Sequence, residues 1–136
     1  MITGAARVDC AILVVSGVEG AMSQTKEHLL LCKHAGVKSV VVYINKADQV
    51  KDPEMFDLIE MEMRDLLTNY GFDGKNSLFV RGSALCALEG RNKEIGEDSI
   101  TALLDVLDTK MPLPDRKQDL PFRLSVEHTI YIKVIP

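Results

Sequence analysis

Apolar runs and helical repeats alternate along the first 111 residues of the chain. Three short runs are rich in β-branched or aromatic side chains, at residues 10–15, 38–45 and 77–80. Runs of this length, bounded by polar residues or glycine, predict buried strands of a parallel sheet. Apolar residues at helical spacing predict a helix after each strand, at residues 23–35, 53–70 and 98–111. This order predicts an α/β fold with right-handed crossovers.

Residues that start and stop helices stand at the ends of these repeats. Asp52 followed by Pro53 is a strong start signal, because aspartate caps a helix and proline fits its first position. Ser23 and Asp98 are the expected N-caps of the other two helices. Gly36 suits the left-handed position that ends the first helix. The helix boundaries are therefore predicted by capping chemistry as well as by periodicity.

The helix at residues 53–70 is expected to have one apolar face in the core and one acidic face in water. The apolar face contains Phe56, Ile59, Met63, Leu66, Leu67 and Tyr70, and we assign the many other Met and Leu positions of residues 55–67 to the same face. The solvated face is predicted to hold Glu54, Asp57, Glu60, Glu62 and Asp65.

The last residues have a different pattern. Every second residue, at Leu124, Val126, His128, Ile130, Ile132 and Val134, alternates with mostly polar neighbours. A period of two predicts a half-buried strand. We therefore divide the chain into an α/β unit at residues 1–111, a linker at 112–121 and the start of an all-β unit at 122–136.

The strand at residues 38–45 runs directly into the tetrad Asn45-Lys46-Ala47-Asp48, of the form N-K-x-D. Ligands of open parallel sheets bind beyond the carboxyl ends of the strands. We expect a buried carboxylate at Asp48, which can accept from the neighbouring N1–H and N2 donors of guanine. Adenine lacks this donor pair and would leave the buried carboxylate unpaired, so such a site rejects it by roughly 10⁴–10⁵. Lys46 can lay its alkyl stem along the base, and Asn45 can use its amide to hold neighbouring loops. Alone, the tetrad is equally compatible with an ordinary solvated turn.

A second motif, Ser83-Ala84-Leu85, follows the third strand in the same way. Because parallel strands end at the same edge of a sheet, the two motifs are expected to be neighbours. A backbone N–H at Ala84 could then donate to guanine O6, where adenine presents a donor of its own. The pair of motifs predicts a guanine-reading site more strongly than either motif alone.

Composition excludes several other classes of function. The chain has 136 residues, a net charge of −4, 46% apolar and 26% charged residues, and no basic stripe that would suit DNA. Cys10, Cys32 and Cys86 are far apart and form no zinc pattern, so no metal site is predicted. No apolar run is long enough to cross a membrane.

These motifs resemble the GTP-binding domain of the elongation factor Tu family. The resemblance covers residues 1 to about 127 and is carried by Met1–Ala6, Ser23–His28, Asn45–Asp48 and Gly82–Gly90. It implies GTP or GDP as ligand, with Mg²⁺, and aminoacyl-tRNA, the ribosome and a nucleotide-exchange factor as partners. It also implies that residues 23–35 lie near the exchange-factor contact. The residues Cys86–Arg91 resemble the mitochondrial branch, which implies the mitochondrial matrix.

The chain also departs from the family pattern. It contains neither the phosphate-binding G-x-x-x-x-G-K-[ST] nor the D-x-x-G of switch II, and from His128 onward it no longer resembles the family. The resemblance aligns Met1 just after switch II, so we expect the carboxyl half of the domain, with no catalytic residue. We expect weak or undetectable GTP binding by this chain alone, no hydrolysis above background, and low stability or self-association. The alternatives are an α/β interaction module without nucleotide chemistry and a product without independent function.

Overall fold

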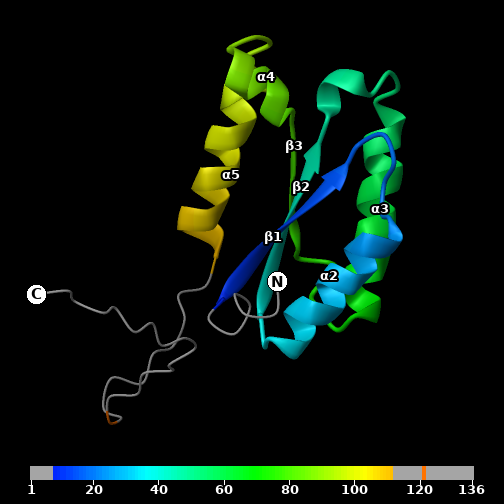
Figure 1. Cartoon of the computed structure of the whole chain (residues 1–136), viewed down its shortest axis with the longest axis vertical. Helices are drawn as coiled ribbons and strands as arrows, with labels where there is room; N and C mark the ends of the chain where they lie inside the picture. The colour runs from blue at the N-terminus through cyan, green and yellow to red at the C-terminus, as the bar shows by residue number, and fades with distance from the viewer. Residues whose placement is uncertain (1–7, 112–120, 122–136) are drawn as a thin grey trace, which may run out of the picture.

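The computed structural model describes residues 8–111 and residue 121. Figure 1 shows a parallel sheet with helices on both faces, which confirms the α/β prediction. The elements are β1 (Cys10–Ser16), α2 (Ser23–His34), β2 (Ser39–Asn45), a 3₁₀ turn η1 (Ala47–Gln49), α3 (Glu54–Asn69), β3 (Leu78–Arg81), α4 (Ala84–Glu89) and α5 (Glu97–Lys110). The linker and the strand predicted at residues 122–136 lie outside the described residues, apart from residue 121.

The three strands are parallel and in the order β1-β2-β3, so β2 is the central strand. Its side chains at Val41, Val42 and Ile44 have no exposure, which confirms the predicted buried strand. Helices α2 and α3 cover one face of the sheet, and α4 and α5 lie on the other (Figure 1). The core fills the space between the sheet and the first pair of helices, with residues Leu13, Val15, Leu29, Val40, Val42, Ile44, Ile59, Met63 and Leu67.

The helix ends follow the predicted chemistry in part. Pro53 takes the N-cap of α3 instead of the predicted first helical position, but Asp52 Oδ1 still accepts from the backbone N–H of Glu54 at 3.0 Å. Gly36 has a φ of +77° in the turn after α2, as predicted. Ser23 and Asp98 are not N-caps, because Met22 and Gly96 take those positions and both predicted residues lie within the first turn. At α2, the Thr25 hydroxyl accepts from the Met22 N–H at 3.3 Å, which sets the start one residue earlier.

β1 is less buried than its apolar sequence predicts. Leu13 and Val15 face the core, but Ile12 is 43% exposed and Val14 is 57% exposed on the other face. The physical reason is the position of α5, which packs against β3 and α4. One face of β1 is therefore uncovered within the part of the chain that the structure describes.

The assignments on α3 were partly wrong. Ile59, Met63 and Leu67 are buried as predicted, but Met55, Leu58 and Met61 are exposed, so these apolar residues form a stripe outside the core. Glu60 lies half-buried instead of in the solvated acidic face, because two arginines bind it. Only one face of α3 can contact the sheet, and apolar periodicity alone did not show how wide that face is.

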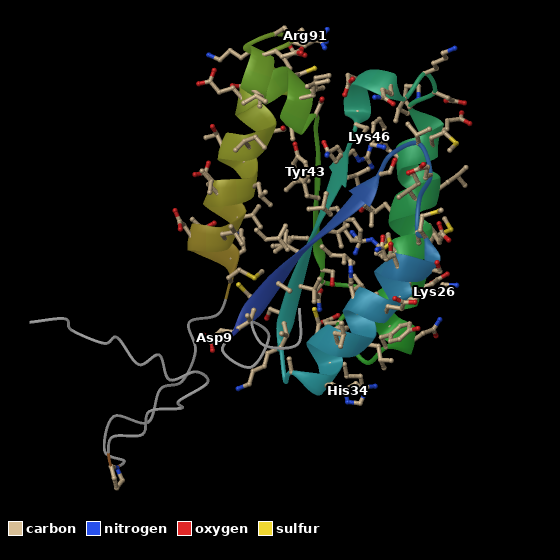
Figure 2. All side chains as sticks on the ribbon, viewed as in Figure 1. Asp9, Lys26, His34, Tyr43, Lys46 and Arg91 are labelled. Carbon is tan, nitrogen blue, oxygen red and sulfur yellow. The ribbon has the colours of Figure 1, made fainter. Side chains whose placement is uncertain are left out.

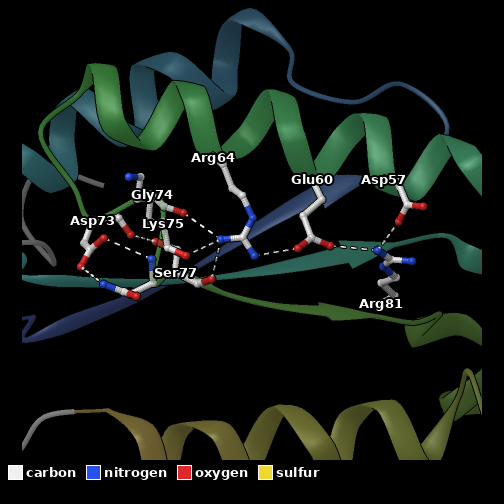
Figure 3. Close-up of polar contacts among 9 residues, drawn as sticks. Asp57, Glu60, Arg64, Asp73, Gly74, Lys75, Ser77 and Arg81 are labelled. Carbon is white, nitrogen blue, oxygen red and sulfur yellow. Dashed lines mark hydrogen bonds and ion pairs between the residues drawn. The ribbon is translucent and has the colours of Figure 1, made fainter.

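Arg64 and Arg81 connect α3 to β3 and to the loop that precedes β3 (Figure 3). The Arg64 guanidinium donates to Glu60 at 2.7 Å, lies 4.5 Å from the centre of the Phe79 ring, and donates to three backbone carbonyls, at Gly74, Lys75 and Ser77. Arg81 donates to Asp57 at 2.7 Å and to Glu60 at 2.9 Å. Glu60 therefore bridges two cations that hold the last strand against the helix.

Replacing Glu60 by glutamine is expected to reduce the fall in the free energy of unfolding that accompanies a decrease in pH. Partial burial raises the pKa of Glu60, but the hydrogen bonds from Arg81 and Arg64 lower it more, so this pKa lies below its ordinary value of 4.5. A carboxyl group whose pKa is lower in the folded state than in the unfolded state stabilises the fold when the pH is above its ordinary pKa. This stabilisation is lost as the pH falls through the pKa of the folded state.

Urea unfolding of both proteins between about pH 6 and about pH 3 measures this difference. Glu62→Gln is the matched control, since Glu62 lies on the same helix and takes no part in the ion pairs of Arg64 and Arg81. Parallel profiles for wild type and Glu60→Gln would contradict the assigned role of Glu60.

In the region that the structure covers, α3 is the longest helix, and no helix combines the length and the apolar character that a membrane crossing requires.

Candidate functional site

The carboxyl ends of the three strands are joined by backbone hydrogen bonds. Gly17, just after β1, donates to the Asn45 carbonyl at 2.7 Å. Gly82, just after β3, donates to the Ile44 carbonyl at 2.9 Å, and its own carbonyl accepts from Ala47 at 3.0 Å. The N-K-x-D tetrad is therefore fixed between the ends of both neighbouring strands, as the parallel sheet predicts. We call this region, residues 45–48 together with residues 82–85, the rim.

A side-chain bond connects the two sequence motifs directly. Asn45 Oδ1 accepts from the backbone N–H of Ala84 at 3.0 Å. The two residues lie 39 positions apart in the sequence. The bond is what we expected of the Asn45 amide, which holds a neighbouring loop. It also occupies the N–H of Ala84 that we expected to donate to guanine O6.

Lys46 occupies a strained position between β2 and η1. Its φ of +62° lies in the left-handed region, which costs a residue other than glycine roughly 1–3 kcal/mol and is often found at functional sites. Its Nζ lies 3.9 Å from Glu19 Oε2, in the loop after β1. Because both side chains are about half exposed, this ion pair orients Lys46 more than it stabilises the fold. Figure 2 shows Lys46 at the carboxyl end of β2.

Asp48 lies on the one-turn helix η1 and is exposed. Within residues 8–111 no group donates a hydrogen bond to its carboxylate, so both oxygens can accept from a ligand. The expectation that this carboxylate is buried was wrong. Water can solvate an exposed carboxylate, so rejection of adenine depends on how far the bound base itself covers Asp48.

Ser83 and Leu85 belong to the start of α4, a helix that we did not predict. Ser83 is fully buried; its Oγ accepts from Cys86 N at 3.3 Å and its N–H donates to the Ile95 carbonyl at 2.6 Å. Leu85 is 46% exposed. Ser83 before the helix and Gly90 after it, with a φ of +67°, are typical capping residues and could have indicated this helix. Its six residues are too few to show helical periodicity. Ser83 is thus a structural residue of the rim.

Two buried hydroxyls, of Tyr43 and Ser99, pack against the rim at Gly82. The sequence analysis did not identify either of them. Tyr43 of β2 lies 3.0 Å from Ser99 Oγ of α5, on the face of the sheet toward α4 and α5 (Figure 2). Ser99 Oγ also lies 2.9 Å from the Ile95 carbonyl and 2.7 Å from the Gly96 carbonyl. Carbonyls only accept, so the Ser99 proton goes to them and Tyr43 donates to Ser99.

Gly82 lies directly against this pair of hydroxyls. A Cβ built at Gly82 would overlap with Ser99 Oγ, Ser99 Cβ and the Tyr43 hydroxyl. On the other side of the rim, a Cβ at Gly17 would lie 2.9 Å from Val50 Cγ2 and 3.1 Å from the Asn45 carbonyl oxygen. Both glycines are therefore required by close packing around the two motifs. Each glycine follows an apolar run after one polar residue, Ser16 or Arg81, which was the available sequence signal.

Two surface hollows stand out in the described part of the structure, and neither is lined by rim residues. One, of about 180 Å³, lies at the amino ends of β2 and β3, between Ser39, Phe72 and Lys110. The other lies between α3 and β3 and is lined by Asp57, Glu60, Met61, Arg64 and Arg81. The rim is therefore an edge of loops and not one of these cavities.

No metal centre is found among the residues that the structure describes, since no three His, Cys, Asp or Glu side chains gather closely enough. His28 and Cys32, four residues apart on α2, have no further ligand there, and burial raises the pKa of the Cys32 thiol. A neutral thiol is a poor metal ligand, which fits a packing role for Cys32.

The parallel sheet and the joined motifs at its carboxyl edge define an α/β domain of the nucleotide-binding type. A model of the elongation factor Tu GTP binding domain matches residues 1–113, and the chain belongs to this family of translational GTPases.

Replacing Asn45 by alanine is expected to release the Ala84 turn from the tetrad. The lost hydrogen bond is exposed, so the free energy of unfolding should fall by about 1 kcal/mol, and the Ala84 amide should exchange faster with solvent. Amide exchange by NMR and urea unfolding measure both effects. Asn45→Asp keeps an acceptor oxygen and should retain the protection of Ala84. Equal protection in all three proteins would contradict the bond.

Proposed function

We propose that the rim reads the guanine base of GTP or GDP. The observation that carries this proposal is the 3.0 Å bond from the Ala84 N–H to Asn45 Oδ1, because it joins N-K-x-D and Ser83-Ala84-Leu85 into one unit. Family membership makes guanine nucleotide the expected ligand. The residues we assign to the guanine site, as base contacts or as supports of those contacts, are Asn45, Lys46, Asp48, Ser83, Ala84 and Leu85.

Four of these residues, Asp48, Lys46, Ala84 and Ser83, have distinct tasks in this proposal. The Asp48 carboxylate accepts from N1–H and N2 of guanine, and the Lys46 stem lies along the plane of the base. Ala84 shares its N–H between Asn45 Oδ1 and guanine O6, in a three-centre bond. Ser83 holds this N–H in place through its cap on α4. The base is therefore recognised by one side-chain carboxylate and one backbone donor on two neighbouring strand ends.

Base contacts alone should bind weakly. A hydrogen bond to a charged group contributes about 1.5–3 kcal/mol, and Asp48 can accept two. Association costs an estimated 4–15 kcal/mol, so little net affinity remains, and a Kd of about 1 mM corresponds to only −4.1 kcal/mol. A micromolar affinity of the 136-residue chain for GDP would contradict this estimate.

The residues present do not fit the Mg²⁺ and phosphate chemistry of the family. The 136 residues contain no G-x-x-x-x-G-K-[ST] string, and the part of the chain that the structure describes gathers no set of metal ligands. Hydrolysis in P-loop enzymes comes from positioning and charge stabilisation around the phosphates. We therefore propose no catalytic residue in this chain and no GTP hydrolysis by it above background.

The parent activity that we propose is that of elongation factor Tu, which delivers aminoacyl-tRNA to the ribosome and is recharged by an exchange factor. The resemblance at Cys86–Arg91 supports the mitochondrial form and the mitochondrial matrix as its location. Cell fractionation followed by detection of peptides from residues 114–136 tests the location, since the residues from His128 onward distinguish this chain from the family. Recovery outside mitochondria would contradict the location and leave the guanine site untouched.

Titration of the ¹⁵N-labelled chain with guanosine and, separately, with adenosine tests the guanine site. Guanosine at millimolar concentration should shift the amide resonances of Lys46, Asp48 and Ala84, and adenosine should not. Nucleosides are the sharper probe, because they lack the phosphates for which this chain has no binding loop. Equal shifts with both nucleosides, or none in a folded chain, would overturn the proposal.

A second candidate function is an α/β interaction module without nucleotide chemistry. The observation in its favour is the exposed stripe of Met55, Leu58 and Met61 on α3, since apolar side chains gathered on one surface often mark a partner site. This module predicts no guanine-specific shift in the titration, so the same experiment separates the two candidates.

A further inference from the structure

Within the described residues, the outer edge of β1 is open to pairing with another strand. Strand β1 pairs with β2 on one side, and among the described residues no strand pairs with its other side. The sequence from Cys10 to Val18 contains no charged residue, and Ile12 and Val14 are 43% and 57% exposed. An edge strand that is long, apolar and uncharged is a template for another strand.

The opposite edge of the sheet, at β3, has features that protect it against pairing with another strand and that β1 lacks. β3 has four residues against seven in β1, and it ends in Arg81, which ion pairs hold to Asp57 and Glu60 of α3. The Arg64 guanidinium covers the ring of Phe79 at 4.5 Å. A short, charged edge resists pairing. Strand addition is therefore expected at β1 and not at β3.

We propose that two copies of this chain pair through β1, antiparallel, to form a closed dimer with one continuous sheet. The occupant that fits best is a second β1, because the edge is complementary to itself. In a register centred on Leu13, Ile12 of one copy lies opposite Val14 of its partner, and both face the side that α5 leaves uncovered. Two-fold pairing uses each β1 edge once and so ends at two copies.

Charge placement agrees with this register. The acidic residue nearest to β1, Asp9, lies opposite Gly17 of the second copy, so no carboxylate faces another across the pair. Cys10 lies opposite Ser16 in the same register. Direct cross-strand neighbours of like charge would destabilise the pair, and this arrangement has none along the strand.

Analytical ultracentrifugation of the full chain over a range of concentrations tests the dimer. We expect twice the mass of one chain for the wild type and the mass of one chain for Val14→Lys, since an edge lysine opposes strand addition. Leu88→Lys is the matched control, because Leu88 is 85% exposed on α4, away from β1, and should remain dimeric. Circular dichroism confirms that each variant is folded.

A disulfide tests the register independently. Ser16→Cys should give a covalent dimer on a non-reducing gel, because its new thiol lies opposite Cys10 of the second copy, whereas Cys10 and residue 16 of one chain are at opposite ends of the strand. Adding Cys10→Ser should abolish that band. Its persistence would show that Cys32 or Cys86 forms the link and would overturn the register.

The remaining outcomes overturn the proposal. A wild type that stays monomeric at all concentrations excludes the dimer, and if its β1 amides are nevertheless protected from exchange, the occupant is a segment of the same chain. A dimer unaffected by Val14→Lys places the interface elsewhere. Species larger than two copies show that pairing is not closed. None of these results depends on whether the rim binds guanine.

Discussion

Asp48→Asn should shift the base preference of the rim from guanine to xanthine. Asparagine offers one donor and one acceptor, which match the O2 and N1–H of xanthine, whereas guanine presents two donors at these positions. Loss of one charge-assisted hydrogen bond of about 1.5–3 kcal/mol corresponds to roughly 10–100-fold in relative affinity. The exposure of Asp48 before binding keeps this factor below the roughly 10⁴–10⁵ of sites built on buried polar groups.

The measurement is the ratio of guanosine to xanthosine affinities, from NMR titrations of wild type and variant. Asp52→Asn is the matched control, because Asp52 is a nearby exposed carboxylate that caps α3 and asparagine caps a helix equally well. The control should keep the guanine preference. An unchanged ratio in Asp48→Asn would remove Asp48 from the base contact.

Gly82→Ala should be the most destabilising single change at the rim. Its Cβ would overlap with Ser99 and with the Tyr43 hydroxyl, both buried. Overpacking costs about 1–3 kcal/mol, and breaking the Tyr43–Ser99 hydrogen bond adds about 1 kcal/mol, so the free energy of unfolding should fall by about 2–4 kcal/mol. Urea unfolding measures this fall, and the Asn45–Ala84 bond should loosen with it.

Gly90→Ala separates steric overlap from backbone strain. A Cβ at Gly90 meets nothing within 4 Å, but the φ of +67° is left-handed, so the expected cost is only about 1–2 kcal/mol. The double variant Gly82→Ala/Ser99→Gly removes two of the overlapping atoms and should recover part of the loss. If Gly82→Ala costs no more than Gly90→Ala, the packing account of the rim is wrong.

The sequence was sufficient for the fold because the strands are encoded locally. Val40 to Ile44 are five consecutive residues of apolar or aromatic, mostly β-branched type, and a run this short is typical of a strand covered on both faces. The positions of Asn45 and Ala84 at one edge followed from the parallel order alone. The sequence predicted that the Asn45 amide would hold a neighbouring loop, but it did not predict that the partner would be the Ala84 N–H. The partner of a side-chain amide depends on distances that the whole sheet sets.

The misses have a common cause in tertiary packing. Val14 and Leu58 have the same apolar character as buried residues, yet both are exposed, because α5 lies over β3 and only one face of α3 meets the sheet. Glu60 is no different from its acidic neighbours in the sequence. Arg64 and Arg81, from two different elements, converge on it and make it a bridge. Helix α4 was missed because six residues are too short for a periodic signal.

The sequence by itself determined the order of the three strands and of helices α2, α3 and α5, the start of α3 next to Asp52 and the two motifs that identify the rim, since each of these depends on residues close together in the chain. The tertiary structure alone decided that Asp48 is open to solvent, that Gly82 packs against Tyr43 and Ser99, and that the outer edge of β1 has no partner strand among the described residues. These features depend on which distant elements meet and which surfaces stay uncovered, and no local pattern of residues encodes that choice.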